Sequence, residues 1–130
     1  MPNTYILRKR VSQPSDLAAK QSLISADGAA GIALNNFVDT YFITKGTAAA
    51  ITLAAPTAGL PRKGGHDGMR ITFVSTTAAA HTVTNSSPGF NNNGGSSDVG
   101  TFGVAIGNGF TVEAYNGAWY VVSSVNVTLG

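Results

Sequence analysis

The side chains that could carry acid–base chemistry are few and scattered along the chain. His66 and Asp67 form the only adjacent acid–base pair, and they lie between two glycines in a sequence typical of a turn. No candidate nucleophile or oxyanion-binding segment lies nearby, so we interpret the pair as structural. His81 shares one face of a predicted strand with Val83, a position typical of a hydrogen-bonded histidine in a core or at an interface. A metal ligand is the alternative interpretation of His81.

The remaining residue types give no pattern of catalysis or metal binding. The chain has no cysteine and two histidines, which excludes a thiolate zinc site, a cysteine nucleophile and a His-rich metal site within one copy. The segment 103–109 is rich in glycine, but it lacks the spacing and the following Lys-Ser/Thr of a phosphate-binding loop. We interpret it as a short strand with an Asn-Gly turn. The body's carboxylates stand singly, at Asp27, Asp39, Asp67, Asp98 and Glu113. We therefore expect no enzyme activity, no cofactor and no metal.

The elements around these residues are predicted to be β-strands. The clearest unit spans residues 110–123, where Asn116-Gly117 is the dipeptide that a two-residue type I′ hairpin turn favours. This turn pairs Ala114 with Trp119 and Glu113 with Tyr120. One face of the hairpin then carries a core stripe, whereas the other face still carries Tyr115, Tyr120 and Val122. Such a hairpin is either central to a sandwich or covered by another subunit.

Four other segments alternate in the same way, and turn sequences separate them. The predicted strands lie within residues 41–44, 51–53, 69–74 and 79–84, and residues 88–100 are predicted to be a surface loop that buries only Phe90 and Val99. Short strands with frequent turns favour an all-β fold, an antiparallel β-sandwich or a jelly-roll-like barrel. We found no internal repeat. Residues 15–24 fit either a short helix or part of an extended N-terminal arm.

Charge divides the chain of 130 residues into two parts. Charged residues make up only 11%, against about 25% in a typical soluble domain. Residues 1–26 hold four basic side chains and one acidic one, whereas residues 27–130 are close to neutral. We therefore expect a basic arm, 1–26, followed by a β domain, 27–130. The sparse charge of the domain indicates either a surface of Ser, Thr and Asn or a surface covered by partners.

The basic arm fits two interpretations. Three adjacent basic residues give only a weak anchor for nucleic acid, no stacking platform accompanies them, and no apolar run is long enough to span a membrane. We expect neither nucleic acid nor a membrane as a partner. The arm is then either a solvated segment or a segment that docks on an acidic protein surface. Its candidate partner-binding residues are Tyr5, Ile6, Leu7, Arg8, Lys9 and Arg10.

Several runs of residues together resemble small virion structural proteins of tailed bacteriophages, most of all capsid decoration (cement) proteins. The resemblance covers about residues 27–130 and is carried by Asp27-Gly28, 42–45, 50–59, 67–84, the Gly89-Phe90-Asn91 loop and 108–123. It implies a non-catalytic all-β protein on the capsid surface of the virion, with its own copies (a homotrimer) and the major capsid protein as partners. A module of a tail fibre or receptor-binding structure is the alternative. That alternative would use the 88–100 loop and exposed aromatic residues to contact a saccharide or receptor. We expect Tyr115, Tyr120 and Val122 to form the oligomer face.

Overall fold

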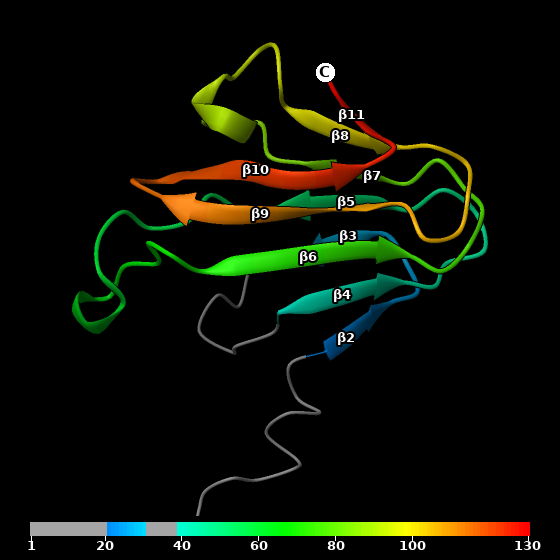
Figure 1. Ribbon diagram of the computed structural model, residues 1–130, viewed down its shortest axis with the longest axis horizontal. Coiled ribbons are helices and arrows are strands. Elements are labelled where there is room, and N and C mark those ends of the chain that lie inside the picture. Colours follow the sequence, from blue (N-terminus) through cyan, green and yellow to red (C-terminus); the bar gives the residue numbers. More distant parts are fainter. Residues whose placement is uncertain (1–20, 31–38) are drawn as a thin grey trace, which may run out of the picture.

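Two β-sheets packed face to face form the part of the chain that the computed structural model describes, residues 21–30 and 39–130 (Figure 1). The strands are β2 (Gln21–Ile24), β3 (Gly28–Ala30), β4 (Thr40–Ile43), β5 (Ala50–Leu53), β6 (Arg70–Ser75), β7 (Thr82–Thr84), β8 (Val99–Phe102), β9 (Gly109–Tyr115), β10 (Ala118–Val125) and β11 (Val127–Leu129). Two 3-10 turns, η2 (Pro61–Lys63) and η3 (Phe90–Asn92), lie in the long connections.

The chain passes from one sheet to the other after each of its first strands. The first sheet has the order β10-β9-β6-β4-β2 and the second β11-β8-β7-β5-β3. The pairs β2–β3, β4–β5 and β6–β7 therefore stack as three turns of a flattened coil, with parallel neighbours in each sheet. β8, β9, β10 and β11 then add antiparallel strands.

The predicted all-β sandwich is confirmed, but its sheets are mixed where antiparallel sheets were expected, and they do not close into a barrel. A chain that crosses to the opposite sheet after each strand returns in the same direction, so the strands of successive turns are parallel. The antiparallel pairs come after the coil: β8 and β9 add to its last strands, β7 and β6, and β10 and β11 then add to β9 and β8. The turns of the coil differ in length, since Gln21 pairs with Thr40 whereas Thr40 pairs with the more distant Thr72. Turns of unequal length give no fixed period, which explains why no repeat is visible in the sequence.

The predicted hairpin is confirmed residue by residue. β9 pairs with β10 so that Tyr115 lies opposite Ala118, Ala114 opposite Trp119 and Glu113 opposite Tyr120. The turn residues Asn116 and Gly117 have φ of 50° and 86°, the left-handed values that a type I′ turn requires. Beyond Val121 the register shifts at a β-bulge, which places an extra residue in β10.

Aromatic side chains form the centre of the core, between the sheets. Phe110 of β9 contacts the rings of Phe73 in the first sheet, Phe102 in the second and Phe90 in η3, with ring centroids 5.5–5.8 Å apart. Trp119 is fully buried, and its indole N–H donates a hydrogen bond of 2.8 Å to the carbonyl of Ala54 at the end of β5. One side chain of the first sheet thus ties the second sheet to it.

Three segments differ from the predicted elements. Residues 103–108 form a loop, and no strand lies there, because the exposed Val104 and Ile106 have no neighbouring strand to pair with. The connection 88–98 is a loop as predicted, with Phe90 buried in the core. The last two residues of the predicted loop instead begin β8, and Val99, expected to be buried, is half-buried on the outward side of that strand. Residues 21–24, at the end of the candidate helix, form β2, which lies inside the span expected to be an arm; residues 1–20 lie outside the described part of the chain.

Candidate interaction surface

The predicted oligomer-face residues lie together on the outward side of the first sheet, near the hairpin turn. Tyr115 is 62% exposed and Val122 is 45% exposed, and Tyr120 lies half-buried between them. The two tyrosine rings are 6.2 Å apart and tilted by 54°. With Glu113 these three side chains line a hollow of about 330 Å³. We call this set, Glu113, Tyr115, Tyr120 and Val122, the tyrosine surface.

An ion pair borders the tyrosine surface. Arg70 of β6 lies opposite Glu113 of β9, and its Nε donates to Glu113 Oε1 at 2.6 Å. Both side chains are partly open to solvent, so the pair adds little to stability. Arg70 and Glu113 carry the only charges on the described strands of this sheet, and they neutralise each other. The surface is therefore aromatic, and its one carboxylate is paired. It suits a protein face or a sugar ring.

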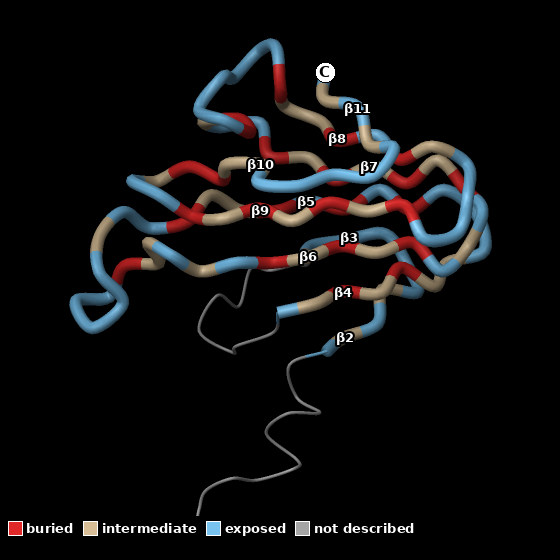
Figure 2. Tube along the Cα trace, viewed as in Figure 1, coloured by how far each residue is buried: buried red, intermediate tan, exposed pale blue. Residues whose placement is uncertain are grey.

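A second group of exposed apolar side chains lies at the other end of the same sheet face. Strand register places Leu23, Phe42, Val74 and Val125 in one row across β2, β4, β6 and β10, with Gly109 of β9 in the gap. Val104 and Ile106, in the loop before β9, are 66% and 70% exposed at this end. Figure 2 shows the second half of β10 and the turn that follows as exposed. We call these six residues, Leu23, Phe42, Val74, Val104, Ile106 and Val125, the strand-end surface.

Polar rows separate the two surfaces. Between them the outward positions are Gln21, Thr40, Thr72, Thr111 and Ser123, one from each strand of the sheet. The hydroxyls of Thr72 and Thr111 bond to each other at 2.8 Å. The tyrosine and strand-end surfaces are thus separate apolar areas on one face, and sequence reasoning found only the first.

The strand-end surface escaped prediction because its residues come from four strands and a loop. A signal was present in Tyr41-Phe42-Ile43, where three successive apolar residues leave one apolar side chain on each side of any strand. The candidate arm residues, 5–10, lie outside the described residues.

His66 and Asp67 are both engaged in holding loops together. The backbone N–H of Thr57 donates to His66 Nδ1 at 2.8 Å, and the backbone N–H of Asn116 donates to Asp67 Oδ1 at 2.8 Å. Asp67 therefore fixes the β9–β10 turn, a contact between segments far apart in sequence, and does not cap its own backbone. Both residues border a hollow of about 400 Å³ beside Arg70, but each side chain already has a structural partner.

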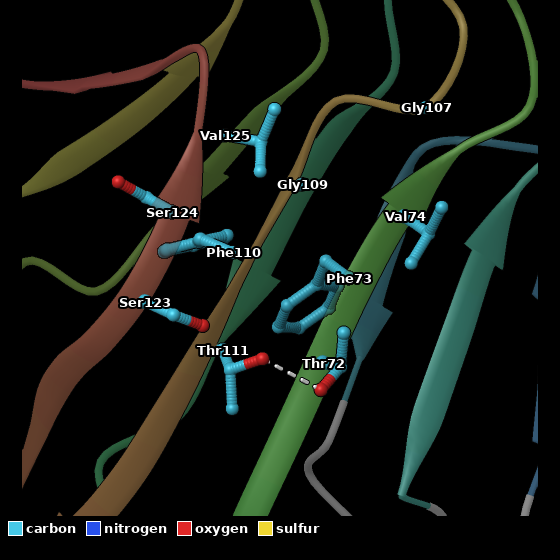
Figure 3. Close-up of a pocket in the computed structure, with 10 residues that line it drawn as sticks. All are labelled: Thr72, Phe73, Val74, Gly107, Gly109, Phe110, Thr111, Ser123, Ser124 and Val125. Carbon is cyan, nitrogen blue, oxygen red and sulfur yellow. Dashed lines mark hydrogen bonds between the residues drawn. The ribbon is translucent and has the colours of Figure 1, made fainter.

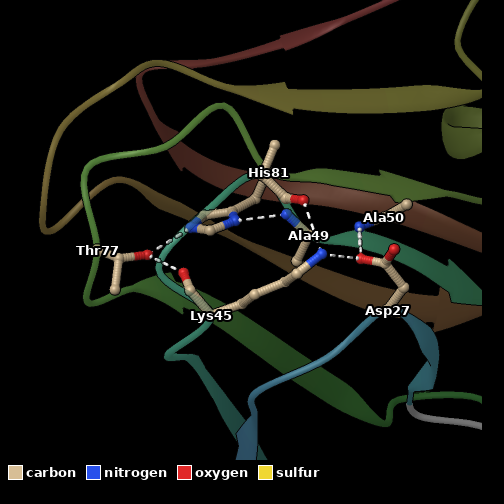
Figure 4. A network of polar contacts seen from close by, with 7 residues as sticks. Asp27, Lys45, Ala49, Ala50, Thr77 and His81 are labelled. Carbon is tan, nitrogen blue, oxygen red and sulfur yellow. Dashed lines mark hydrogen bonds and ion pairs between the residues drawn. The ribbon is translucent and has the colours of Figure 1, made fainter.

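His81 is a buried, hydrogen-bonded core histidine, which confirms that interpretation (Figure 4). Its Nδ1 accepts from the backbone N–H of Ala49 at 3.0 Å, and its Nε2 lies 2.9 Å from Thr77 Oγ1. Because Thr77 Oγ1 donates to the carbonyl of Lys45, we assign the ring proton to Nε2. Burial lowers the pKa of His81, and the neutral ring joins two turns of the coil.

An exposed ion pair lies next to this network. Asp27 Oδ1 accepts from Lys45 Nζ at 2.8 Å and from the backbone N–H of Ala50 at 2.9 Å. These bonds, that of Lys45 foremost, lower the pKa of Asp27. Figure 4 shows Asp27 reaching across to the start of β5. The carboxylate thus fastens the connection before β3 to the neighbouring turn of the coil.

Within residues 21–30 and 39–130, no group of three or more His, Asp or Glu side chains is placed to hold a metal ion. No helix in these ranges is long and apolar enough to cross a membrane. No protein-family model, curated protein or solved structure matches the chain. The two exposed apolar surfaces are therefore the features of the described residues that bear most directly on function.

Proposed function

We propose that this chain is a non-catalytic structural protein of tailed-bacteriophage virions, a decoration (cement) protein. In this proposal it binds the outer capsid surface as a homotrimer, and its partners are its own copies and the major capsid protein. The resemblance of residues 27–130 to such proteins supports the assignment. A rigid two-sheet body is also well suited to bridging neighbouring shell subunits.

The observation that carries the proposal is the pair of separate apolar surfaces on one sheet face. Exposed large apolar areas mark interaction sites on soluble proteins. The tyrosine surface and the strand-end surface lie at opposite ends of the strands, with polar rows between them. A decoration protein needs two kinds of contact, one with its sister subunits and one with the shell. Two surfaces meet that need.

The shell would be stabilised by multivalency. Each copy contributes a modest affinity, but a trimer engages several capsid subunits at once, so its release requires that all contacts break together. The basic residues Arg8, Lys9 and Arg10 would favour an acidic capsid face and set the encounter rate and register. The apolar residues Tyr5, Ile6 and Leu7 could pair with a sheet edge of the capsid protein.

Binding to expanded capsids that lack decoration protein tests the proposal. The wild-type protein is expected to saturate regularly spaced sites and to raise the temperature at which the capsids rupture. A variant with Arg8, Lys9 and Arg10 changed to serine is expected to bind more weakly and with less salt dependence. The matched control changes the exposed Arg62 and Lys63 to serine and should bind as the wild type does. Absence of saturable binding by the wild type would contradict the proposal.

A tail-fibre or receptor-binding module is the second candidate, and the hollow of the tyrosine surface favours it. Two exposed aromatic rings beside a carboxylate could stack on a sugar and accept hydrogen bonds from its hydroxyls. This function predicts that the protein ignores capsids and binds host cells. A Tyr115→Ala, Tyr120→Ala variant would then lose cell binding.

A further inference from the structure

The strand-end surface is a continuous apolar row on a face that is otherwise polar. The pairing of Leu23 with Phe42, Phe42 with Val74, Val74 with Gly109 and Gly109 with Val125 runs through all five strands of the first sheet. Neighbouring strands lie about 4.8 Å apart, so the row spans about 19 Å. Leu23 and Val125 at its ends are 69% and 62% exposed.

Gly109 leaves a hollow in this row. The hollow has a volume of about 160 Å³, and Val74, Val125 and Gly109 lie around it (Figure 3). A Cβ at position 109 would lie 2.2 Å from the backbone oxygen of Phe73, so β6 and β9 approach too closely for any side chain here. The hollow is therefore a fixed feature of the backbone. It is large enough for an aliphatic side chain from outside.

The same end of the molecule also presents aliphatic side chains. The loop that carries Val104 and Ile106 is held in place at both ends: Gly107 N–H donates to the carbonyl of Ser75, and Gly103 N–H donates to that of Asn126. The side chain of Asn108 further ties the loop to the Gly103 carbonyl at 2.8 Å. These three hydrogen bonds fix the loop, so Val104 and Ile106 are already held in the exposed positions from which they could contact another protein.

We propose that the strand-end surface is where copies of this chain contact one another, and that the tyrosine surface is left for a different partner. The inference rests on the proposed function, which requires self-association, and it names the surface responsible. It also differs from the expectation that Tyr115, Tyr120 and Val122 form the oligomer face.

A second copy fits this surface better than a foreign partner because the surface complements itself. It carries both aliphatic projections, Val104 and Ile106, and a hollow that could receive one. None of its six residues is charged, so two copies can meet with no like charges opposed and no ion left unpaired. The tyrosine surface, by contrast, has the Arg70–Glu113 ion pair at its edge. A polar rim of this kind is typical of interfaces whose partners can also exist apart.

The exposed apolar area could form the centre of a copy-to-copy contact. Leu23, Val104, Ile106 and Val125 each expose well over half of their side chains, on the order of 100 Å² apiece or about 400 Å² together. This is about half of the roughly 800 Å² that each partner buries in a standard interface. The rest would come from Phe42, Val74 and the polar residues around the row. The contact would be mainly apolar, and its strength should therefore persist in high salt.

Light scattering over a range of protein concentrations tests the inference, once at low salt and once in about 1 M NaCl, where charges are screened. The wild type is expected to form an oligomer under both conditions. Ile106→Asp introduces a carboxylate at a 70%-exposed loop position, where it should leave the far-UV circular dichroism unchanged. It should weaken association by about 100-fold or more, because the charge would be buried without a partner. Tyr115→Asp, the matched control at a 62%-exposed position, should keep the wild-type mass.

A second variant covers the case in which the aspartate disturbs the loop. Val104→Ser, Ile106→Ser adds no charge and is also expected to shift the protein towards monomer. Dissociation by Tyr115→Asp with no effect of the loop variants would overturn the inference in favour of the tyrosine surface. A wild type that stays monomeric at every concentration would overturn it as well. A wild type that oligomerises through the loop but ignores capsids would defeat the proposed function and leave this inference standing.

Discussion

Removing the indole of Trp119 should destabilise the sandwich more than the loss of any exposed aromatic ring. Trp119 is fully buried on the inward side of β10, and it is the only tryptophan. Its N–H reaches the carbonyl of Ala54 in the other sheet at 2.8 Å. Trp119→Ala therefore removes both apolar packing and a hydrogen bond between the sheets.

The expected loss is about 3–5 kcal/mol in the free energy of unfolding, the range for truncating a buried aromatic side chain to alanine. About 1 kcal/mol of this belongs to the hydrogen bond. Trp119→Phe separates the two contributions, since it keeps an aromatic ring but leaves the Ala54 carbonyl without its donor. Its expected cost is about 1–2 kcal/mol, with a further contribution from the smaller ring.

Urea unfolding followed by far-UV circular dichroism measures these losses, because the variants lack tryptophan fluorescence. With a denaturant slope of about 2 kcal/mol per M, Trp119→Ala should lower the midpoint by about 2 M. The measurement needs two protein concentrations, since self-association adds stability by mass action. Tyr115→Ala on the other side of the same hairpin is the control and should change the unfolding free energy by less than about 0.5 kcal/mol. Equal losses for Trp119→Ala and Tyr115→Ala would refute the assignment of the two hairpin faces.

Three further changes test other parts of the fold. Burial holds the pKa of His81 below its ordinary value of 6.5. The contribution of His81 to stability is therefore complete above pH 6.5 and declines as the pH falls towards the folded-state pKa. Urea titrations at a series of pH values should show this decline in the wild type, and the decline should be absent in His81→Phe. Gly109→Ala should lower the free energy of unfolding by about 1–3 kcal/mol, because its Cβ would meet the Phe73 carbonyl. A variant that melts at the wild-type temperature would count against the close approach of β6 and β9. Asp27→Asn should leave the urea midpoint close to that of the wild type, because the Lys45 pair is exposed and the amide oxygen still accepts from the backbone N–H of Ala50. A clear drop in the midpoint would give the ion pair a greater role than its exposure allows.

The hairpin of β9 and β10 could be predicted from sequence because its determinants are local. Asn116-Gly117 sets the turn, the turn sets the register, and alternation then assigns Trp119 to the core and Tyr115 to the outside. The same local alternation located β4, β5, β6 and β7 to within a residue or so, except that the strand predicted over 79–84 was too long: β7 begins only at Thr82. It also placed the tyrosine surface, which lies wholly on this hairpin.

The order of the strands could not be predicted in the same way. Parallel pairing of β2 with β4 and of β4 with β6 depends on contacts between residues far apart in sequence, and no turn dipeptide encodes it. The strand-end surface shares this origin, since Leu23, Phe42 and Val74 become neighbours only when three turns of the coil stack. β11, three residues long, carries too few residues for an alternating pattern.

The placement of charge gives the low charge content a structural meaning. Of the charged side chains in residues 21–30 and 39–130, only Arg70 and Glu113 lie on sheet strands, and they neutralise each other. The outward residues of the second sheet are uncharged and mostly small: Ala50, Thr52, Thr82, Thr84, Val99, Thr101 and Thr128. The threonine hydroxyls make this face polar without any charge. The second sheet face can therefore be solvated and needs no covering partner. The first sheet face instead exposes large apolar side chains, those of Leu23, Tyr115 and Val125, which a solvated polar face does not need. Sparse charge thus has two origins in one molecule: a neutral polar face on the second sheet, and an exposed apolar face on the first, which we propose is covered by partners.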